Sequence, residues 1–298
     1  MTGARLPKDA PRVLVVYKRS TYERYGGRKN ERVAKLLRRG DVTVAHLREA
    51  HDAHRDTIER ARKALHGMRV RAVFEHHHDP KPDDHWDLVV TLGGDGTLLW
   101  TSHMVGPHTP MVAINSAPIT SVGYFCAGPG TAVADLLGHA LEGRLERTVL
   151  TRMRVVVDGR VISKRILNDV LFCHECPASS TRYVIGHRGV EEEQLSSGLW
   201  VGPAAGSTAA QHSAGGKVLL VRSRKLQYVV REPYHGIGMR YRRTRGLVSP
   251  SEVLVVKSKI REGMLFLDGH NKTQAVDIGS TIELSVSDEP LILLGMRR

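Results

Sequence analysis

The chain has few cysteines, few aromatic residues and no long apolar run, and each shortage excludes a class of protein. Its three cysteines, in 298 residues, cannot form the disulfide scaffold of a small secreted domain, which favours a reducing compartment. No stretch approaches the ~20 apolar residues that a membrane-spanning helix requires. Residues 1–11 also lack the apolar core of a signal peptide. We therefore expect a cytoplasmic protein with no membrane partner.

Acidic residues are outnumbered by basic ones, and this imbalance indicates the kind of ligand. The 44 Lys and Arg against 31 Asp and Glu leave a formal charge of +13, which favours anionic partners such as nucleotides, polyphosphate or nucleic acid. Aromatic residues make up only 5% of the chain and no nucleic-acid recognition motif occurs, which argues against nucleic acid. We expect a small anionic ligand and no nucleic acid.

Several nucleotide-binding signatures are absent. The chain contains no P-loop sequence, no complete protein-kinase catalytic loop and no Rossmann fingerprint. P-loop NTPases, protein kinases and Rossmann dehydrogenases are therefore excluded by their motifs.

The most informative segment is an apolar run over residues 88–92 that leads directly into Gly93-Gly94-Asp95-Gly96-Thr97. Glycines let the backbone approach a ligand closely and direct N–H groups at it, so this sequence is typical of a phosphate-binding turn at a helix N-terminus. An acidic side chain would repel a bound phosphate unless it contacts Mg²⁺ or a hydroxyl that attacks the phosphorus, so Asp95 indicates one of these contacts. The alternative is a tight turn in which Asp95 caps the helix.

The first half of the chain alternates between predicted strands and helices. We expect strands over 12–17, 42–44, 70–74, 87–92 and 111–115, and helices over 30–39, 52–66, 97–105 and 131–141. Such alternation predicts a parallel sheet with helices packed on it, in a domain over residues 12–146. Ligands of these sheets bind at the carboxyl ends of the strands, where Gly93 to Thr97 fall.

From residue 147 the pattern changes to short alternating runs. We expect strands over 153–157, 166–173, 182–185, 198–201, 226–231, 253–257, 264–267 and 281–286, and one helix over 207–214. This pattern predicts a mainly β second domain over residues 147–287. The last run, 291–294, is compatible with a return of residues 288–298 to the first domain.

Polar or small residues stand in three places where a simple scaffold does not need them. Residues 115–125 form a turn-rich loop after a predicted strand. Asn168 and Asp169 interrupt an apolar run, where they suit the two hydroxyls of a ribose or form a structural turn. Residues 196–216 lead through a small-residue loop into the predicted helix, whose start either holds a sugar or phosphate or is simply capped.

Taken in order, these segments resemble the NAD kinase family. The resemblance lies in Gly93-Gly94-Asp95-Gly96-Thr97, in Asn168-Asp169, in Gly206-Ser207-Thr208-Ala209 with Ser213-Ala214-Gly215-Gly216, and in the late turn Leu267-Asp268-Gly269. It spans about residues 12–294. The glycine motif alone is shared with lipid kinases, whereas the ordered set is far more specific. The implied fold is an α/β domain with a parallel sheet followed by a mainly β domain.

The resemblance implies a kinase that phosphorylates the 2′-hydroxyl of the adenosine ribose of NAD(H) to give NADP(H). The first domain would hold the donor, ATP or polyphosphate with Mg²⁺, and the second the dinucleotide. Asp95 would be the catalytic acid–base residue. The binding residues carried over by position are Gly93, Gly94, Gly96 and Thr97 for the donor, Asn168, Asp169 and Asp268 for the ribose, and Thr208 and Ser213 for the dinucleotide. A homodimer or homotetramer is implied as well.

The chain departs from the family pattern at two positions. Ala210 stands where bacterial relatives usually have Tyr, and Ser197 stands where they usually have Asp; both positions concern the nicotinamide half of the ligand. The longer loop at Asn115, together with Ser196-Ser197-Gly198, resembles the divergent branch that includes the mitochondrial NAD kinases. Two alternatives stay open: a lipid kinase of the diacylglycerol or sphingosine type, which shares the glycine motif, and a non-catalytic dinucleotide-binding regulator, which the two replacements favour.

Two further clusters resemble metal sites. Cys173-His174-Glu175-Cys176 has the spacing of half a zinc site, but no second pair lies at a matching interval, so we interpret it as structural. His76-His77-His78 precedes a proline turn and is interpreted as a solvated loop. We predict no protein metal centre.

Overall fold

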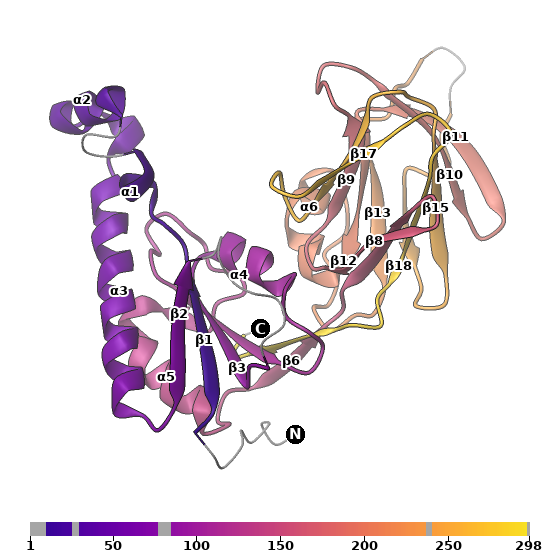
Figure 1. The fold of residues 1–298 in the computed structure, drawn as a ribbon. Coiled ribbons are helices and arrows are strands. Elements are labelled where there is room, and N and C mark those ends of the chain that lie inside the picture. The colour runs from indigo at the N-terminus through magenta and orange to yellow at the C-terminus, as the bar shows by residue number, and fades with distance from the viewer. Residues whose placement is uncertain (1–9, 26–29, 77–84, 237–239, 297–298) are drawn as a thin grey trace. The chain divides into compact units, whose positions relative to one another are not determined.

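The computed structural model describes residues 10–25, 30–76, 85–236 and 240–296, and the chain divides into two units (Figure 1). The first unit comprises Met1–Thr148 with Leu291–Arg298, and the second comprises Val149–Pro290. In the described residues, no helix combines the length and the apolar character needed to cross a membrane. The predicted pairing of an α/β unit that has a parallel sheet with a mainly β unit is confirmed.

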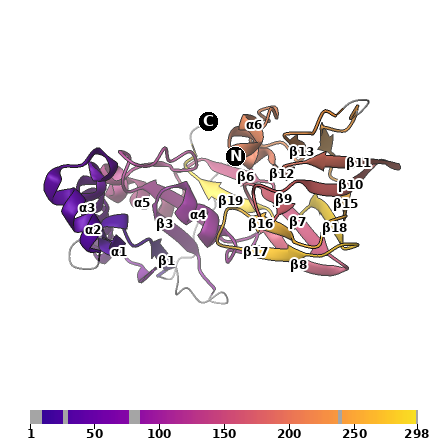
Figure 2. The same ribbon diagram turned by 90° about the horizontal axis from the view of Figure 1, so that it is seen from above.

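The first unit is built on a seven-stranded sheet in the order β2-β1-β3-β4-β19-β6, with β5 beside β4. Its strands are β1 Arg12–Tyr17, β2 Arg71–His76, β3 Leu88–Gly93, β4 Pro110–Asn115, β5 Gly128–Pro129, β6 Arg147–Leu150 and β19 Leu291–Leu294. Strand β1 pairs in parallel with β2 and β3, and β4 pairs in parallel with β3 and β19. Figure 2 shows β19 beside β6. The carboxyl ends of β1, β2, β3 and β4 therefore meet at one edge.

The helices of the first unit are α1 Thr21–Tyr25, α2 Glu31–Arg39, α3 Leu47–Gly67, α4 Asp95–Ser102 and α5 Val133–Leu141, with short 3₁₀ turns η2 Val42–Val44 and η3 Gly130–Ala132. Of these, α3 and α5 pack on the sheet through a shared apolar core. Ala61 and Leu65 of α3 join Leu137 of α5 against Val15 and Val90 of the sheet. Spacings of three and four residues place each helix's apolar side chains on one face, which explains this packing.

The predicted strand over 42–44 is wrong, because these residues form the 3₁₀ turn η2. The Asp41 carboxylate accepts a hydrogen bond from the Thr43 N–H at 2.9 Å and so caps the turn. The side chain of Val42 is 86% exposed. The β-branched residues favour a strand, but no strand among the described residues pairs with them.

The second unit consists of two six-stranded antiparallel sheets, in the orders β11-β10-β15-β18-β7-β8 and β14-β13-β12-β9-β16-β17. The strands are β7 Met153–Val157, β8 Arg160–Ile166, β9 Val170–His174, β10 Thr181–His187, β11 Val190–Ser196, β12 Gly198–Pro203, β13 Leu226–Arg231, β14 Arg245–Val248, β15 Val253–Ser258, β16 Gly263–Leu267, β17 Thr273–Val276 and β18 Thr281–Val286. One core cluster takes apolar side chains from both sheets, including Met153, Tyr183, Leu199 and Leu265.

Two predicted elements of the second unit differ from the structure. The predicted helix over 207–214 is broken into a 3₁₀ turn, η4 Ala204–Thr208, and a single helical turn, α6 Ala210–Ser213. Ala209 separates them with a backbone outside the helical region, at φ −97° and ψ −134°. The predicted strand over 166–173 is also interrupted, since Asn168 and Asp169 lie between the end of β8 and the start of β9.

Candidate active site

The glycine turn lies where β3 passes into α4. Gly93 ends the strand and Gly94 takes the N-cap position of the helix. A Cβ on Gly93 would clash with the Thr97 side chain, and one on Gly94 would clash with Ser121. Beside Gly96 nothing lies within 4 Å of such an atom, so the start of the helix faces open space. The turn therefore combines close packing behind with room for a ligand in front, as a phosphate-binding helix N-terminus requires.

Asp95 does not cap α4. Its two carboxylate oxygens instead accept hydrogen bonds from the backbone N–H groups of Tyr124 and Phe125, at 2.8 and 2.9 Å. A carboxylate oxygen accepts two hydrogen bonds, so each retains a lone pair for a further donor. The helix-capping alternative for Asp95 is therefore wrong in this structure, and the carboxylate is held in a fixed position.

The loop after β4 is itself anchored beside the glycine turn. The Ser116 N–H donates to the Gly93 carbonyl at 3.1 Å. The Asn115 amide donates to the Ser121 carbonyl at 2.9 Å. These bonds fix the backbone that in turn holds Asp95. Burial, and secondarily the Asp95 charge, raise the pKa of the neighbouring Cys126 thiol to about 12, so this thiol is neutral at physiological pH.

A second group of predicted residues lies in the second unit, around the break between β8 and β9. The Asp268 carboxylate accepts three backbone hydrogen bonds: from Leu167 at 2.9 Å, from Asn168 at 2.7 Å and from Asp169 at 3.0 Å. Asp268 adopts a left-handed backbone, with φ of +51°, at the turn after β16. This geometry supports a positioning role for Asp268. A direct contact with the ribose stays a prediction.

Asp169 is a buried acid, with 4% of its surface exposed. Burial and, secondarily, the negative charge of Asp268 raise the pKa of Asp169 to about 7. The Asn168 amide donates a hydrogen bond to one of its oxygens at 3.2 Å. The pair therefore offers an amide beside a carboxyl group, and the protonation state of the carboxyl group changes near neutral pH.

The small-residue segment packs directly on this pair. A Cβ on Gly206 would lie 2.9 Å from the Cα of Asn168 and would clash with its carbonyl oxygen, so only glycine permits the approach. The Ser207 hydroxyl donates to the Ala204 carbonyl at 2.7 Å and accepts from the Leu219 N–H at 2.9 Å. It therefore joins two backbone segments and has a structural role. Two motifs that are far apart in sequence thus form one cluster.

Thr208 and Ser213 stand at the ends of the two short turns. Thr208 ends η4 and is half-buried, whereas Ser213 ends α6 and is exposed. Neither hydroxyl makes a side-chain hydrogen bond within the described part of the chain. Both are therefore available to a ligand, and their predicted role in dinucleotide binding stays a prediction.

Comparison with known proteins places these two clusters in a family. Residues 23–144 match the family model of the ATP-NAD kinase N-terminal domain. A probable NADH kinase of Oryza sativa subsp. japonica is 32% identical over 261 residues, which cover 80% of each chain. The chain belongs to the NAD kinase family.

Other members of the NAD kinase family agree with this assignment. An NADH kinase of Arabidopsis thaliana is 32% identical over 69% of this chain and 71% of its own. An NAD kinase from Archaeoglobus fulgidus, solved in complex with ATP, has the same fold, with a TM-score of 0.65 at 22% identity over 95% of this chain and 92% of its own. Yeast NADH kinase, solved in complex with NADH, has a TM-score of 0.73 at 16% identity, over 96% of this chain and 84% of its own. These relatives support the predicted dinucleotide kinase and not the lipid kinase alternative.

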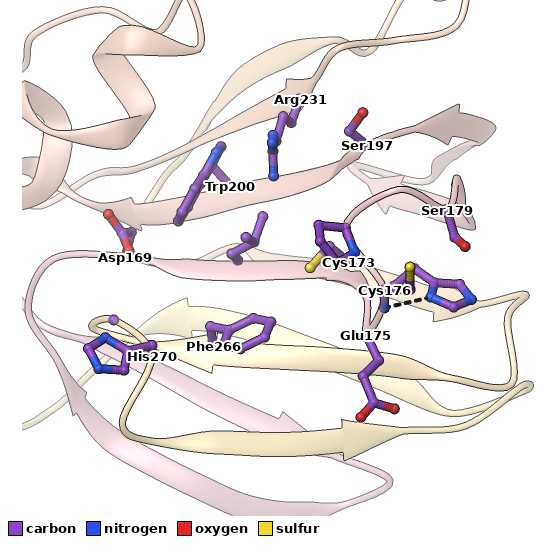
Figure 3. A pocket seen from close by; sticks show the side chains of 14 residues that line it. Asp169, Cys173, Glu175, Cys176, Ser179, Ser197, Trp200, Arg231, Phe266 and His270 are labelled. Atoms are coloured by element: carbon purple, nitrogen blue, oxygen red, sulfur yellow. Dashed lines mark hydrogen bonds between the residues drawn. The ribbon is translucent and has the colours of Figure 1, made fainter.

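In this member of the NAD kinase family, a cavity of about 340 Å³ opens beside Asp169 on the outer face of the sheet that contains β9 (Figure 3). Trp200 on β12 and Phe266 on β16 both pair in register with Leu171 on β9, so the three side chains form one row across the sheet. Arg231 lies further along the cavity, away from Asp169. Sequence reasoning missed these lining residues, although aromatic residues on predicted strands were a usable signal.

The segment Cys173-His174-Glu175-Cys176 does not form a metal site. Cys173 is buried in the sheet and Cys176 is exposed, while His174 accepts a hydrogen bond from the Cys176 N–H at 3.0 Å. Among the described residues, no three His, Cys, Asp or Glu side chains are grouped to hold a metal ion. Of the three consecutive histidines only His76 is described, and the other two lie outside the described residues.

Proposed function

We propose that this chain transfers a phosphoryl group from ATP to the 2′-hydroxyl of the adenosine ribose of NAD(H), giving NADP(H). The observation that carries the proposal is the Asp95 carboxylate, held by two backbone N–H groups beside a glycine turn and still able to accept from a hydroxyl. The ordered motifs and the relatives named NAD and NADH kinases support the same reaction.

Asp95 acts on the attacking hydroxyl. A carboxylate is too weak a base to remove the proton from a sugar hydroxyl in advance, so Asp95 orients the oxygen and accepts the proton late in the reaction. Such late acceptance suffices in phosphoryl transfer, because the transition state is loose and most catalysis comes from positioning and charge stabilisation. The fixed orientation of Asp95 is therefore the useful property of the site.

The donor phosphates would lie at the N-terminus of α4, where the backbone at Gly96 is open to a ligand. Mg²⁺ fits this site because it is commonly held by phosphate oxygens and water with only one or two protein carboxylates. Here the ion would be held by the donor's own phosphate oxygens and by water, which leaves the Asp95 carboxylate for the attacking hydroxyl. When bound, the ion would neutralise charge that develops on the transferred phosphoryl group.

The dinucleotide would be held by the second unit. Asn168 and Asp169 together present donors and acceptors that match a ribose diol, and Asp268 keeps their backbone in place. Thr208 and Ser213 would add hydroxyl contacts to the dinucleotide. NADP biosynthesis as the cellular role and a dimeric or tetrameric assembly stay predictions from the family resemblance, and a cytoplasmic location stays a prediction from the composition.

A non-catalytic dinucleotide-binding protein is the competing function, because Ala210 and Ser197 replace residues that are usual in the family. One assay decides between them: formation of NADP or NADPH from NAD and NADH, each with Mg²⁺ and with ATP, GTP or polyphosphate. Formation of either product supports the kinase. Tight binding of NAD without product from any donor would favour the regulator.

The Asp95→Asn variant tests the assigned catalytic group. We expect it to fold and to bind NAD and ATP normally, but to lose ~10²–10⁴-fold in turnover, the usual value of acid–base catalysis. Asp135→Asn, which removes an exposed carboxylate on α5, is the matched control and should keep full activity. ATP affinity reports separately on whether the loop at Tyr124 and Phe125 has moved. Near-normal turnover in Asp95→Asn would refute the assignment.

A further inference from the structure

A second cavity, of about 500 Å³, lies in the first unit at the carboxyl ends of β1 and β2, beside the N-terminal half of α3. Its lining is rich in basic and imidazole side chains, namely Lys18, Arg55, Arg62, His51, His54 and His76. The edge of a parallel sheet at the carboxyl ends of its strands is the usual ligand-binding edge of such folds. None of the roles assigned above uses this cavity.

The cations of the cavity are only partly matched by acids. Three permanent cations face two carboxylates, those of Glu23 and Glu59. Burial, and secondarily the nearby Arg24, lower the pKa of the Lys18 ammonium. In the described residues no carboxylate lies within ion-pair distance of Lys18 or Arg55. Because Lys18 is half-buried, and a half-buried cation without an acid is costly, a bound anion would stabilise this arrangement.

The cations are spread along a line. Arg55 and Arg62 are seven residues apart on α3, which places them on one face of the helix and about 10 Å apart. The guanidinium carbon of Arg62 lies over the Phe74 ring, 4.2 Å from its centre. Planar guanidinium groups pair well with phosphate oxygens. A line of such groups suits an extended anion better than a single ion.

One of the histidines at this wall supports the same conclusion. The Nδ1 atom of His76 is buried and has no hydrogen-bond partner in the described part of the chain. A ligand oxygen would satisfy this atom, and the Tyr17 ring, 4.4 Å away between centres, holds the imidazole in place. His54, by contrast, is fully bonded. Burial lowers its pKa, so it is neutral; its Nε2–H donates to the Lys18 carbonyl at 2.8 Å.

His54 also connects this cavity to the glycine turn. With the proton on Nε2, its Nδ1 accepts from the Ser116 hydroxyl at 2.7 Å, and the Ser116 N–H donates to the Gly93 carbonyl. The wall of the cavity and the predicted donor site thus share one short chain of hydrogen bonds. We propose that the cavity lined by Lys18, Arg55, Arg62 and His76 is a binding site for an anion of two or more linked phosphate groups.

The test uses tripolyphosphate as the probe and isothermal titration of the full chain. We expect Arg55→Gln to weaken binding about tenfold and Arg55→Glu about a hundredfold, in line with the strength of charge-assisted hydrogen bonds. Arg60→Gln is the matched control, since Arg60 is exposed on the same helix, pairs with Asp56 and does not line the cavity. Arg55 is itself exposed, so its variants should fold normally.

Repeating the titration with a saturating non-hydrolysable ATP analogue identifies the source of the phosphates. If the analogue abolishes the Arg55-dependent binding, the cavity holds the far phosphates of the donor itself. If that binding persists, the cavity is a separate anion site. Absence of tripolyphosphate binding in the wild type, or equal affinity in Arg55→Glu and Arg60→Gln, would overturn the proposal. This readout does not depend on NADP formation, so it is independent of the proposed reaction.

Discussion

The Asp169→Asn variant should be more stable than the wild type at alkaline pH. The carboxyl group of Asp169 titrates at about 7 in the folded protein, compared with 3.8 for the unperturbed group. Between these values the folded state binds more protons than the unfolded state, so stability falls as the pH rises, and the full penalty applies above pH 7. An amide at the same position carries no charge and escapes this penalty.

The magnitude follows from the shift. Each pKa unit corresponds to 1.36 kcal/mol, so a shift of about three units destabilises the ionised form on the order of 4 kcal/mol. For a unit of this size that corresponds to roughly 10 °C in the melting temperature. The amide oxygen of the variant can still accept the hydrogen bond that the Asn168 amide donates, so this contact is kept.

Thermal unfolding followed by circular dichroism from pH 4 to pH 8.5 would measure this effect. We expect Asp169→Asn to unfold well above the wild type at pH 8 and the difference to shrink toward pH 4. Glu175→Gln, which removes an exposed carboxylate next to β9, should match the wild type throughout. An Asp169→Asn variant that is equally or less stable at pH 8 would show that the ionised carboxylate is well compensated, contrary to our reasoning. The increased stability of Asp169→Asn should coincide with weaker NAD binding, because residues of functional sites are often unfavourable for stability.

Three other predictions concern the same cluster. Asp268→Asn removes one of the two acceptor oxygens that serve three backbone donors, so we expect a loss of about 1–3 kcal/mol in unfolding free energy. The KM for NAD should rise while the KM for ATP stays unchanged. A lower melting temperature with both KM values unchanged would mean that Asp268 has a purely structural role. Gly206→Ala forces a methyl group against the backbone of Asn168 and should lower the free energy of unfolding by about 1–3 kcal/mol. The control is Gly106→Ala, whose methyl group would meet nothing within 4 Å and should change stability little. Equal stabilities of the two variants in denaturant titration would contradict the packing argument. The KM for NAD should fall as the pH rises through about 7, because ionised Asp169 is the stronger acceptor for a ribose hydroxyl, and a flat KM between pH 6 and 8 would count against that contact.

Local patterns were sufficient wherever the structure depends on neighbours in sequence. The strand, glycine turn and helix around Gly93 to Thr97 are recognisable from an apolar run followed by residues that only a tight turn needs. The change from a βα alternation to short alternating strands likewise predicted an α/β unit followed by a β unit. The ordered motifs were enough for the family, because several independent segments in a fixed order rarely coincide by chance.

Local patterns failed where packing overrides propensity. The β-branched residues of 42–44 favour a strand, but they pair with no strand in the described part of the chain, and the segment forms a turn instead. The helical pattern of 207–214 is broken beside Gly206, where close contact with the backbone of Asn168 sets the path of the chain. Neither neighbour is visible in the segment itself.

The amino-acid sequence by itself determined which chemical groups this protein has: a carboxylate in a glycine turn, an amide–carboxyl pair, and an excess of cations. Only the tertiary structure decided what each group does. Asp268 holds the backbone of residues about 100 positions away, and strand register brings Trp200 and Phe266 into one row. The raised pKa of Asp169 has the same origin, because burial and the charge of a distant residue are properties of the packed chain. Hydrogen bonds, register and desolvation act between residues that are distant in sequence, so no local pattern contains them.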